Sequence, residues 1–196
     1  MVATKGPRGA GLVVDTHAHW FPEEWVRLVE KEGACCGATI TRSGDNLKFT
    51  GGGLTSVFSR EFVDIDRRLA AMDRQGVDVH ALSLTTPMVY FAPPDYALAL
   101  SQAYNDAAAA AHQKYPTRFI GMAMLPMHAP ALALKEIERA AKLPGMRGLY
   151  MGTHVHDKEL DDPSFFEVYA RCEELGWPIY LHPMDPIGMP RMKKYY

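Results

Sequence analysis

The feature that most constrains the fold is a regular alternation of short apolar runs with longer helix-like segments. Five runs have the length and composition of buried strands: residues 11–19, 77–87, 118–127, 146–154 and 177–185. Amphipathic or alanine-rich segments that end near glycine or proline separate these runs. Strands that alternate with helices predict βα units and a parallel sheet.

Two architectures are compatible with five βα units, a doubly wound open sheet and a (β/α)8 barrel. The first strand is not followed by the glycine-rich G-x-G-x-x-G pattern that dinucleotide-binding sheets carry. Histidines follow the strands instead: His17 and His19 after the first, His154 after the fourth and His182 after the fifth. Because barrels build their sites at the carboxyl ends of strands, this placement favours the TIM-barrel type.

One segment departs from the alternation. Residues 39–53 have β-branched residues on both sides of the turn cluster Ser43-Gly44-Asp45-Asn46, which predicts a small hairpin insertion. A helix follows, with an apolar stripe at Phe62, Ile65, Leu69 and Met72 and with Ser59 as its expected N-cap.

The spacing of His17 and His19 suggests a metal site. Residues i and i+2 of a strand point to the same face, so both imidazoles can reach one cation, and His182 can add a third nitrogen. Asp15 has the same parity and can support the pair. The alternative is that this His-x-His is polar lining at a strand end.

Bulk properties set broad limits. The 196 residues carry a formal net charge of −2, which gives no reason to expect nucleic acid or an anionic membrane as a partner. No apolar run approaches the ~18 residues that span a bilayer. Three cysteines without metal-ribbon spacing are expected to be reduced thiols, so we expect a cytoplasmic protein.

The two ends of the chain carry a specific resemblance. "VDTHAHWFPEEW" and "HPMDPIGMPRMKKYY" resemble the amidohydrolase superfamily (amidohydrolase-2 type), in its aminocarboxymuconate-semialdehyde decarboxylase branch. Segments such as "RLAAMDRQGVDVHALS" and "RFIGMAMLPMHAP" match that branch in order and spacing. The branch also contains decarboxylases of hydroxybenzoates.

The resemblance implies roles for particular residues. His17, His19 and His182 correspond to ligands of one metal ion, most often Zn²⁺ and otherwise another divalent transition metal. Asp185 corresponds to a position near the ligand histidine, and His154 to a position that can line the substrate pocket. Lys48 stands nearest to an arginine that grips a substrate carboxylate in this branch, with Arg42 as a weaker substitute.

The resemblance also implies that the chain covers about strands 1–5 of the barrel. The family's remaining ligand, an aspartate after strand eight, and its acid/base histidine after strand six have no counterpart here, so the catalytic residue stays unknown. We expect residues 1–196 to be a single TIM-barrel domain that is incomplete at the C-terminus. Such a barrel has roughly 300–350 residues. In this branch the barrels are expected to form homodimers.

Three functions follow from these expectations. The first is a metal-dependent carbon–carbon lyase, a decarboxylase that acts on an unsaturated or aromatic carboxylic acid through a metal-activated water. The second is a hydrolase of an amide, ester or lactone on the same scaffold, which would use the same ligands. The third is a non-catalytic barrel fragment. Structural zinc prefers four closed ligands, often cysteines, and no cysteine lies at a matching strand end, which disfavours the third function.

Overall fold

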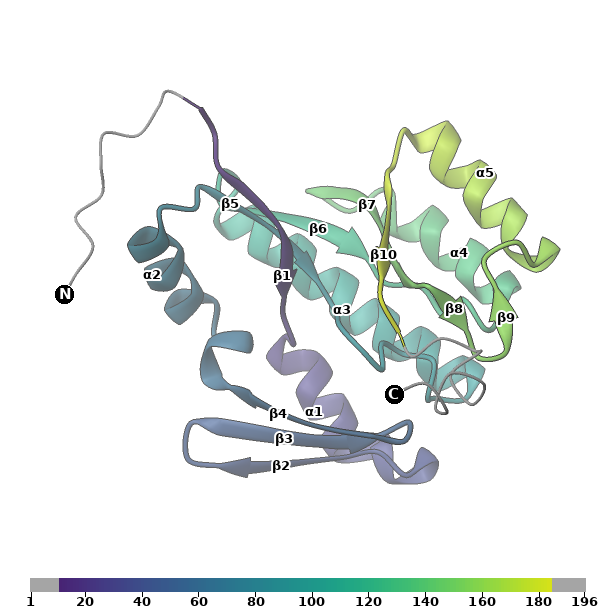
Figure 1. Cartoon of the computed structure of the whole chain (residues 1–196), viewed down its shortest axis with the longest axis horizontal. Helices are drawn as coiled ribbons and strands as arrows, with labels where there is room; N and C mark the ends of the chain where they lie inside the picture. The colour runs from purple at the N-terminus through teal and green to yellow at the C-terminus, as the bar shows by residue number, and fades with distance from the viewer. Residues whose placement is uncertain (1–10, 185–196) are drawn as a thin grey trace, which may run out of the picture.

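The structure is a computed structural model that describes residues 11–184. Its centre is a five-stranded sheet in the order β1-β5-β6-β7-β10 (Figure 1). The strands are β1 (Val14–His19), β5 (Val79–Ser83), β6 (Phe119–Ala123), β7 (Met146–Gly152) and β10 (Ile179–His182). Every neighbouring pair is parallel. The strand order follows the chain without reversal, as in a barrel and unlike a doubly wound sheet, so the predicted TIM-barrel type is confirmed.

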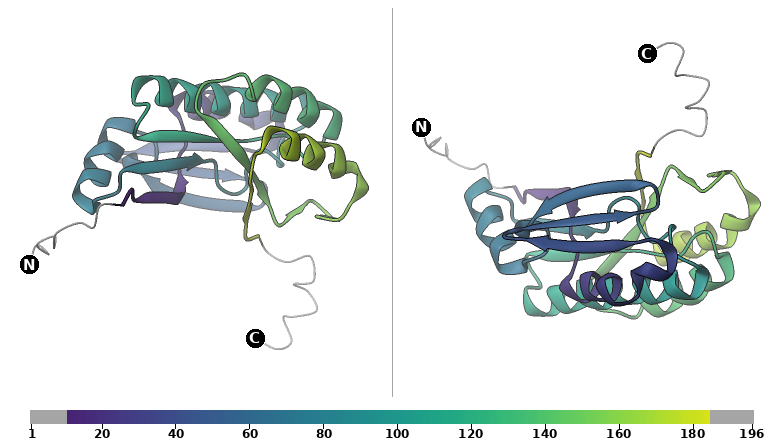
Figure 2. Two further views of the ribbon diagram at one scale, coloured as in Figure 1. Left: turned by 90° about the horizontal axis from the view of Figure 1, so that it is seen from above. Right: turned by 90° about the horizontal axis from the view of Figure 1, so that it is seen from below.

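Helices cover one face of this sheet. The helices are α1 (Glu23–Glu32), α2 (Ile65–Gln75), α3 (Pro94–Lys114), α4 (Pro130–Ala140) and α5 (Phe166–Leu175). Figure 2 shows α3, α4 and α5 side by side on the outer face of the strands. Alanines of α3, including Ala97 and Ala108, are fully buried and let this long helix approach β6 closely. No helix within residues 11–184 is long and apolar enough to cross a membrane.

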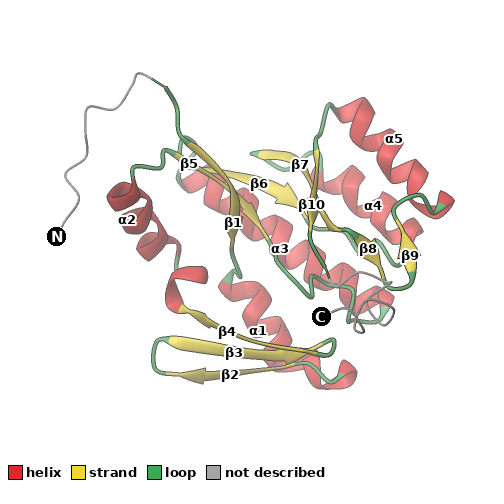
Figure 3. Cartoon of the chain, viewed as in Figure 1, coloured by secondary structure: helices red, strands yellow, loops and turns green. Residues whose placement is uncertain are grey.

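The predicted hairpin is part of a larger element. The strands β2 (Thr39–Ser43), β3 (Asn46–Gly51) and β4 (Leu54–Ser59) form a three-stranded antiparallel sheet, so a third strand extends the 39–53 hairpin (Figure 3). Aromatic contacts join this sheet to the segment after β1. The rings of Phe21 and Phe58 stack with centroids 4.3 Å apart, and Trp25 lies 6.0 Å from Phe49.

Short elements complete the chain. Two-residue strands β8 (His154–Val155) and β9 (Lys158–Glu159) follow β7, and 3₁₀ turns span Gly33–Cys36, Arg60–Phe62 and Pro163–Phe165. The prediction that Ser59 is the N-cap of α2 is wrong because a turn at Arg60–Phe62 comes before the helix. The turn delays the start of α2, whose N-cap is Asp64 and not Ser59; the Asp64 carboxylate accepts hydrogen bonds from the N–H groups of Asp66 and Arg67.

Candidate metal centre

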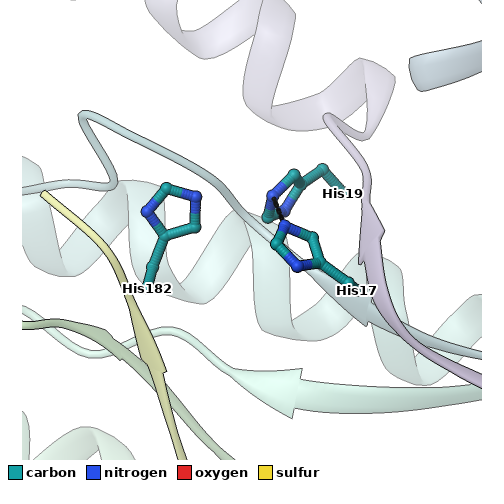
Figure 4. A group of neighbouring side chains, drawn as sticks. All are labelled: His17, His19 and His182. Atoms are coloured by element: carbon teal, nitrogen blue, oxygen red, sulfur yellow. Dashed lines mark hydrogen bonds between the residues drawn. The ribbon is translucent and has the colours of Figure 1, made fainter.

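Three histidines from the two outermost strands of the parallel sheet meet in space. His17 and His19 end β1, and His182 ends β10 (Figure 4). One ring nitrogen of each lies within 4.8 Å of the other two, and among residues 11–184 this is the group of metal-ligating side chains that converges. His17 is exposed, whereas His19 and His182 are half-buried, so the group opens to solvent on one side.

The two histidines of β1 are in chelating geometry. Their Nε2 atoms lie 2.8 Å apart, with the ring planes inclined at 74°. Nitrogens that share one tetrahedral zinc ion at ~2.0–2.1 Å each lie roughly 3.3 Å apart. The observed separation is about 0.5 Å shorter, so a small outward movement of either ring brings both nitrogens to a common cation.

Two hydroxyl groups from the end of β5 orient the rings. Ser83 Oγ lies 3.1 Å from His19 Nδ1, and Thr85 Oγ1 lies 3.1 Å from His182 Nε2. The other nitrogen of His182, Nδ1, is buried and has no hydrogen-bond partner within the described part of the chain. The His19 ring is thus held through Nδ1 while its Nε2 faces His17 and remains for a ligand, an arrangement typical of metal-binding histidines.

An irregularity in β1 contributes to this geometry. The pairing of β1 with β5 shifts register between Asp15 and Ala18, which is where His17 lies. The backbone N–H of His17 donates to Asp15 Oδ1 at 2.9 Å. A bulge of this kind leaves a backbone group unpaired and redirects the adjacent side chain, and the Asp15 carboxylate satisfies the freed donor.

A buried cation lies behind β1. The Arg68 guanidinium of α2 donates to the backbone carbonyl of His19 and, at 3.3 Å, contacts Nδ1 of His80. His80 Nε2 lies 3.6 Å from Asp15 Oδ2. Burial lowers the pKa of Arg68 to about 10, so the guanidinium stays charged at neutral pH. Burial, and then the charge of Arg68, lower the pKa of His80 to about 4, which keeps its ring neutral.

Burial also acts on the ligand candidates. It lowers the pKa of His19 to about 4, with smaller contributions from His17 and His182. Burial is likewise the largest cause of the lowered pKa of His182. A neutral imidazole is the form that binds a metal ion, so the fold holds these two rings in the competent state at neutral pH.

Two adjoining pockets open beside the histidines and share Thr86. The smaller, of about 340 Å³, is lined by His19, His182, Thr85, Thr86, Ser56, Val57 and the rings of Phe21, Phe58 and Phe62. The larger, of about 500 Å³, is lined by Gly52, Gly53, Leu54, Thr86, Pro87, His154, Pro183 and Met184. Together they form a cavity that is apolar near the hairpin and bears imidazoles at the strand ends.

The other predicted site residues lie in different positions. His154 lines the larger pocket, and its Nδ1–H donates to the His156 carbonyl at 2.9 Å. Lys48 is exposed on β3, directly opposite Val57, which borders the smaller pocket. Arg42 is already engaged by two carboxylates of α1, those of Glu23 and Glu30. Asp185 lies outside the described residues.

Sequence analysis missed four residues that contact this site: Arg68, Ser83, Thr85 and Tyr150. The Tyr150 ring lies 5.8 Å from that of His19 and 5.9 Å from that of His182. Ser83 and Thr85 follow an apolar run just as the histidines do, so their position at a strand end was a usable signal. Arg68 interrupts the apolar stripe of its helix, and a charge on a buried face is also a signal.

Comparison with known proteins agrees with this geometry. The amidohydrolase family model matches residues 14–194. The chain is 33% identical to 2-amino-3-carboxymuconate-6-semialdehyde decarboxylase from Dictyostelium discoideum, over 94% of this chain and 52% of the relative. It is 34% identical to gamma-resorcylate decarboxylase from Polaromonas, over 62% of this chain and 40% of that protein.

A solved structure shows the same fold. This chain superposes with a TM-score of 0.73 on 5-carboxyvanillate decarboxylase from Novosphingobium aromaticivorans, a structure with manganese and 4-hydroxy-3-methoxy-5-nitrobenzoic acid. The identity is 26%, and the match covers 95% of this chain and 55% of the other. The chain therefore spans about half the length of the relatives that it matches. Sequence, strand order and the converging histidines together place the chain in the amidohydrolase family, in its aminocarboxymuconate-semialdehyde decarboxylase-like branch.

Proposed function

We propose that this chain supplies the metal-binding part of a decarboxylase that acts on an unsaturated or aromatic carboxylic acid. His17, His19 and His182 would hold one divalent cation. The observation that carries the proposal is the convergence within 4.8 Å of three ring nitrogens carried by the two edge strands of the sheet. The named activities of the relatives, all carbon–carbon cleavages that release CO₂, favour a lyase over a hydrolase.

Zinc is the metal that we propose. Three imidazole nitrogens suit zinc, whereas manganese, present in the related structure, more often takes oxygen ligands. When bound, the cation supplies a Lewis acid that polarises a substrate oxygen and lowers the pKa of water. Asp15 would support the ligands through the backbone of His17, and Asp185 remains a prediction for the same kind of role.

The aromatic residues of the smaller pocket would bind the substrate ring. Phe21, Phe58 and Phe62 line its wall beside His19 and His182. An apolar wall next to polar strand ends can hold a planar ring by stacking and exclude water around it. The apolar wall does not bind the substrate carboxylate, which polar groups would hold instead.

Lys48 and His154 are our candidates for binding that carboxylate. Lys48 shares a face of the hairpin sheet with Val57, and His154 lies across the cavity in the wall of the larger pocket. A lysine supplies a point charge and not a bidentate fork, so we expect selectivity for a different acid from one gripped by arginine. Lys48→Gln should raise KM more than it lowers kcat, since the contact is made in the ground state as well.

The function is tested by CO₂ release. The full-length gene product, loaded with zinc or manganese, is offered a panel of carboxymuconate and hydroxybenzoate acids and, in parallel, lactones and esters. CO₂ from at least one acid, lost when His17 and His19 are replaced by alanine, is the expected result. Turnover of a lactone or ester with no CO₂ from any acid would assign the protein to the hydrolases instead.

Two further proposals concern the setting of the enzyme. We propose a cytoplasmic location, which the unpaired state of Cys35, Cys36 and Cys172 supports. We also propose a homodimer, an expectation that comes from the family and that light scattering on the purified full-length protein tests directly.

A further inference from the structure

We propose that Arg68 is a positioning residue which, with His80 and Asp15, holds the backbone of the ligand pair His17 and His19. The inference rests on the proposed metal site and extends it to a helix that contributes no ligand. Arg68 is 8% exposed on α2 and His80 is 6% exposed on β5, whereas the Asp15 side chain is 40% exposed, and these residues line one pocket of about 270 Å³ together with His17 and His19.

The contact with His19 is direct. The Arg68 guanidinium donates to the backbone carbonyl of His19, across 49 positions of sequence. This carbonyl belongs to the last residue of β1, beyond which the chain leads into α1. A charged donor on this carbonyl fixes the peptide plane at the strand end, and with it the direction in which the His19 ring leaves the strand.

The contact with His17 runs through two side chains. A guanidinium can only donate, so His80 Nδ1, 3.3 Å from Arg68 Nη1, must accept. The proton of the neutral ring is then on Nε2, which faces Asp15 Oδ2 at 3.6 Å, an electrostatic contact longer than a hydrogen bond. Asp15 and His80 are also direct partners in the pairing of β1 with β5.

Asp15 completes the connection. Its Oδ1 accepts the backbone N–H of His17 at 2.9 Å, at the irregular step of β1. Arg68 thus contacts the carbonyl of His19 directly and is connected to the N–H of His17 through His80 and Asp15. These two groups lie at the two ends of the segment His17-Ala18-His19, and together they determine how the two imidazoles converge.

Fold stability alone does not account for Arg68. Among the described residues its hydrogen-bond acceptors are neutral, a carbonyl and an imidazole, its Nε is buried without a partner, and the carboxylates of Asp15 and Glu61 act on its charge without a hydrogen bond to it. A buried guanidinium in such surroundings costs free energy that an apolar side chain would not. The positioning role explains why a guanidinium stands here, because its donors hold the backbone of β1.

Zinc affinity and histidine NMR test the proposal on the full chain. Arg68→Met removes the donors and keeps much of the apolar stem. Arg139→Met is the matched control, since it breaks the contact with the fully buried Glu136 on α4 and so destabilises the fold elsewhere. Zinc affinity is measured by competition with a chromophoric chelator, and ring tautomers by ¹⁵N spectra of the metal-free histidines.

We expect Arg68→Met to weaken zinc binding by roughly tenfold or more, as loss of a ligand's supporting partner does. Arg139→Met should leave zinc affinity unchanged even where its free energy of unfolding falls. His80 should show the Nε2–H tautomer in the wild type and lose it in Arg68→Met. Arg68→Lys, which keeps the charge but cannot reach both acceptors, should recover stability more than zinc affinity.

Two outcomes would overturn a claim, and a third requires a replacement variant. If wild type and Arg68→Met bind zinc equally, the positioning role is wrong while the metal site stands. If the wild type binds no zinc, the proposed metal function fails, and the NMR spectra still decide the positioning role: unchanged His17, His19 and His80 signals in Arg68→Met would exclude it. If Arg68→Met does not fold, His80→Ala replaces it, with the same expected loss of zinc affinity.

Discussion

The chain contains the pattern His-x-His twice, and the two copies behave differently. In His17-Ala18-His19 the Nε2 atoms of the two rings face each other at 2.8 Å. In His154-Val155-His156 the ring nitrogens bond backbone carbonyls: His154 Nδ1 donates to His156 itself, and His156 Nε2 donates to Tyr90 at 2.8 Å. In the first pair one nitrogen of each ring faces the other ring, whereas in the second pair one nitrogen of each ring bonds a backbone carbonyl instead.

The backbone explains the difference. His17 and His19 end a strand, where side chains two positions apart share a face. His156 lies in the turn between β8 and β9 with φ of 56°, a left-handed conformation that carries its ring away from that of His154. His156 instead approaches His128, with ring centroids 5.1 Å apart. The spacing i, i+2 therefore predicts a chelating pair only where the chain is extended.

The largest expected effect is on zinc content, and it compares the two histidine pairs directly. Replacing His17 and His19 together by alanine should reduce bound zinc from about one per chain to near none, because a site cannot hold zinc on one remaining imidazole. The matched double variant at His154 and His156 should keep its zinc. Elemental analysis of both purified proteins is the measurement, and equal zinc content in the two would contradict the assignment.

The next effect concerns the hydroxyl that orients His19. Ser83→Ala removes the partner of His19 Nδ1, and we expect roughly a tenfold loss of zinc affinity. Ser101→Ala is the control, because Ser101 is equally buried but lies on α3, and its hydroxyl has no hydrogen-bond partner among the described residues. Chelator competition measures both, and a comparable loss in the two variants would show that buried serines act only through the fold.

A smaller effect should appear in the second histidine pair. His156→Ala loses the hydrogen bond to the Tyr90 carbonyl, so the free energy of unfolding should fall by about 1 kcal/mol while zinc affinity stays constant. His156→Gly loses the same bond but relieves the positive φ and should be less destabilised. Urea denaturation of the metal-free proteins measures the difference. A drop in zinc affinity with either variant would contradict the assignment of this second pair to a purely structural role.

The smallest effect is a pH dependence. Burial, and then the proximity of His156, lower the pKa of His128 below its ordinary 6.5. The unfolded state then binds more protons as the pH falls below 6.5, so this residue contributes a loss of stability on acidification. His128→Gln should make the free energy of unfolding fall less steeply between about pH 7.5 and pH 5. If the free energy of unfolding falls equally steeply with pH in the wild type and in the variant, His128 does not contribute to the loss of stability in acid.

Much of the fold could be read from local pattern. The five strands and the helices between them follow from apolar periodicity and from glycine and proline breaks, which act over a few residues. The start of α2 was misplaced because Ser59 and Asp64 are both good N-caps, and the 3₁₀ turn at Arg60–Phe62 decides between them. The third strand of the hairpin sheet was missed because its pairing with β3 is a tertiary choice.

The sequence by itself determined which histidines end strands, and therefore that His17, His19 and His182 lie at the carboxyl end of a parallel sheet. Only the tertiary structure decided which His-x-His converges, which hydroxyls hold the rings, and that Arg68 on α2 reaches the strand that carries His17 and His19. The reason is physical. Strand position depends on neighbours in the chain, whereas the direction of a ring depends on backbone angles and on partners tens of residues away.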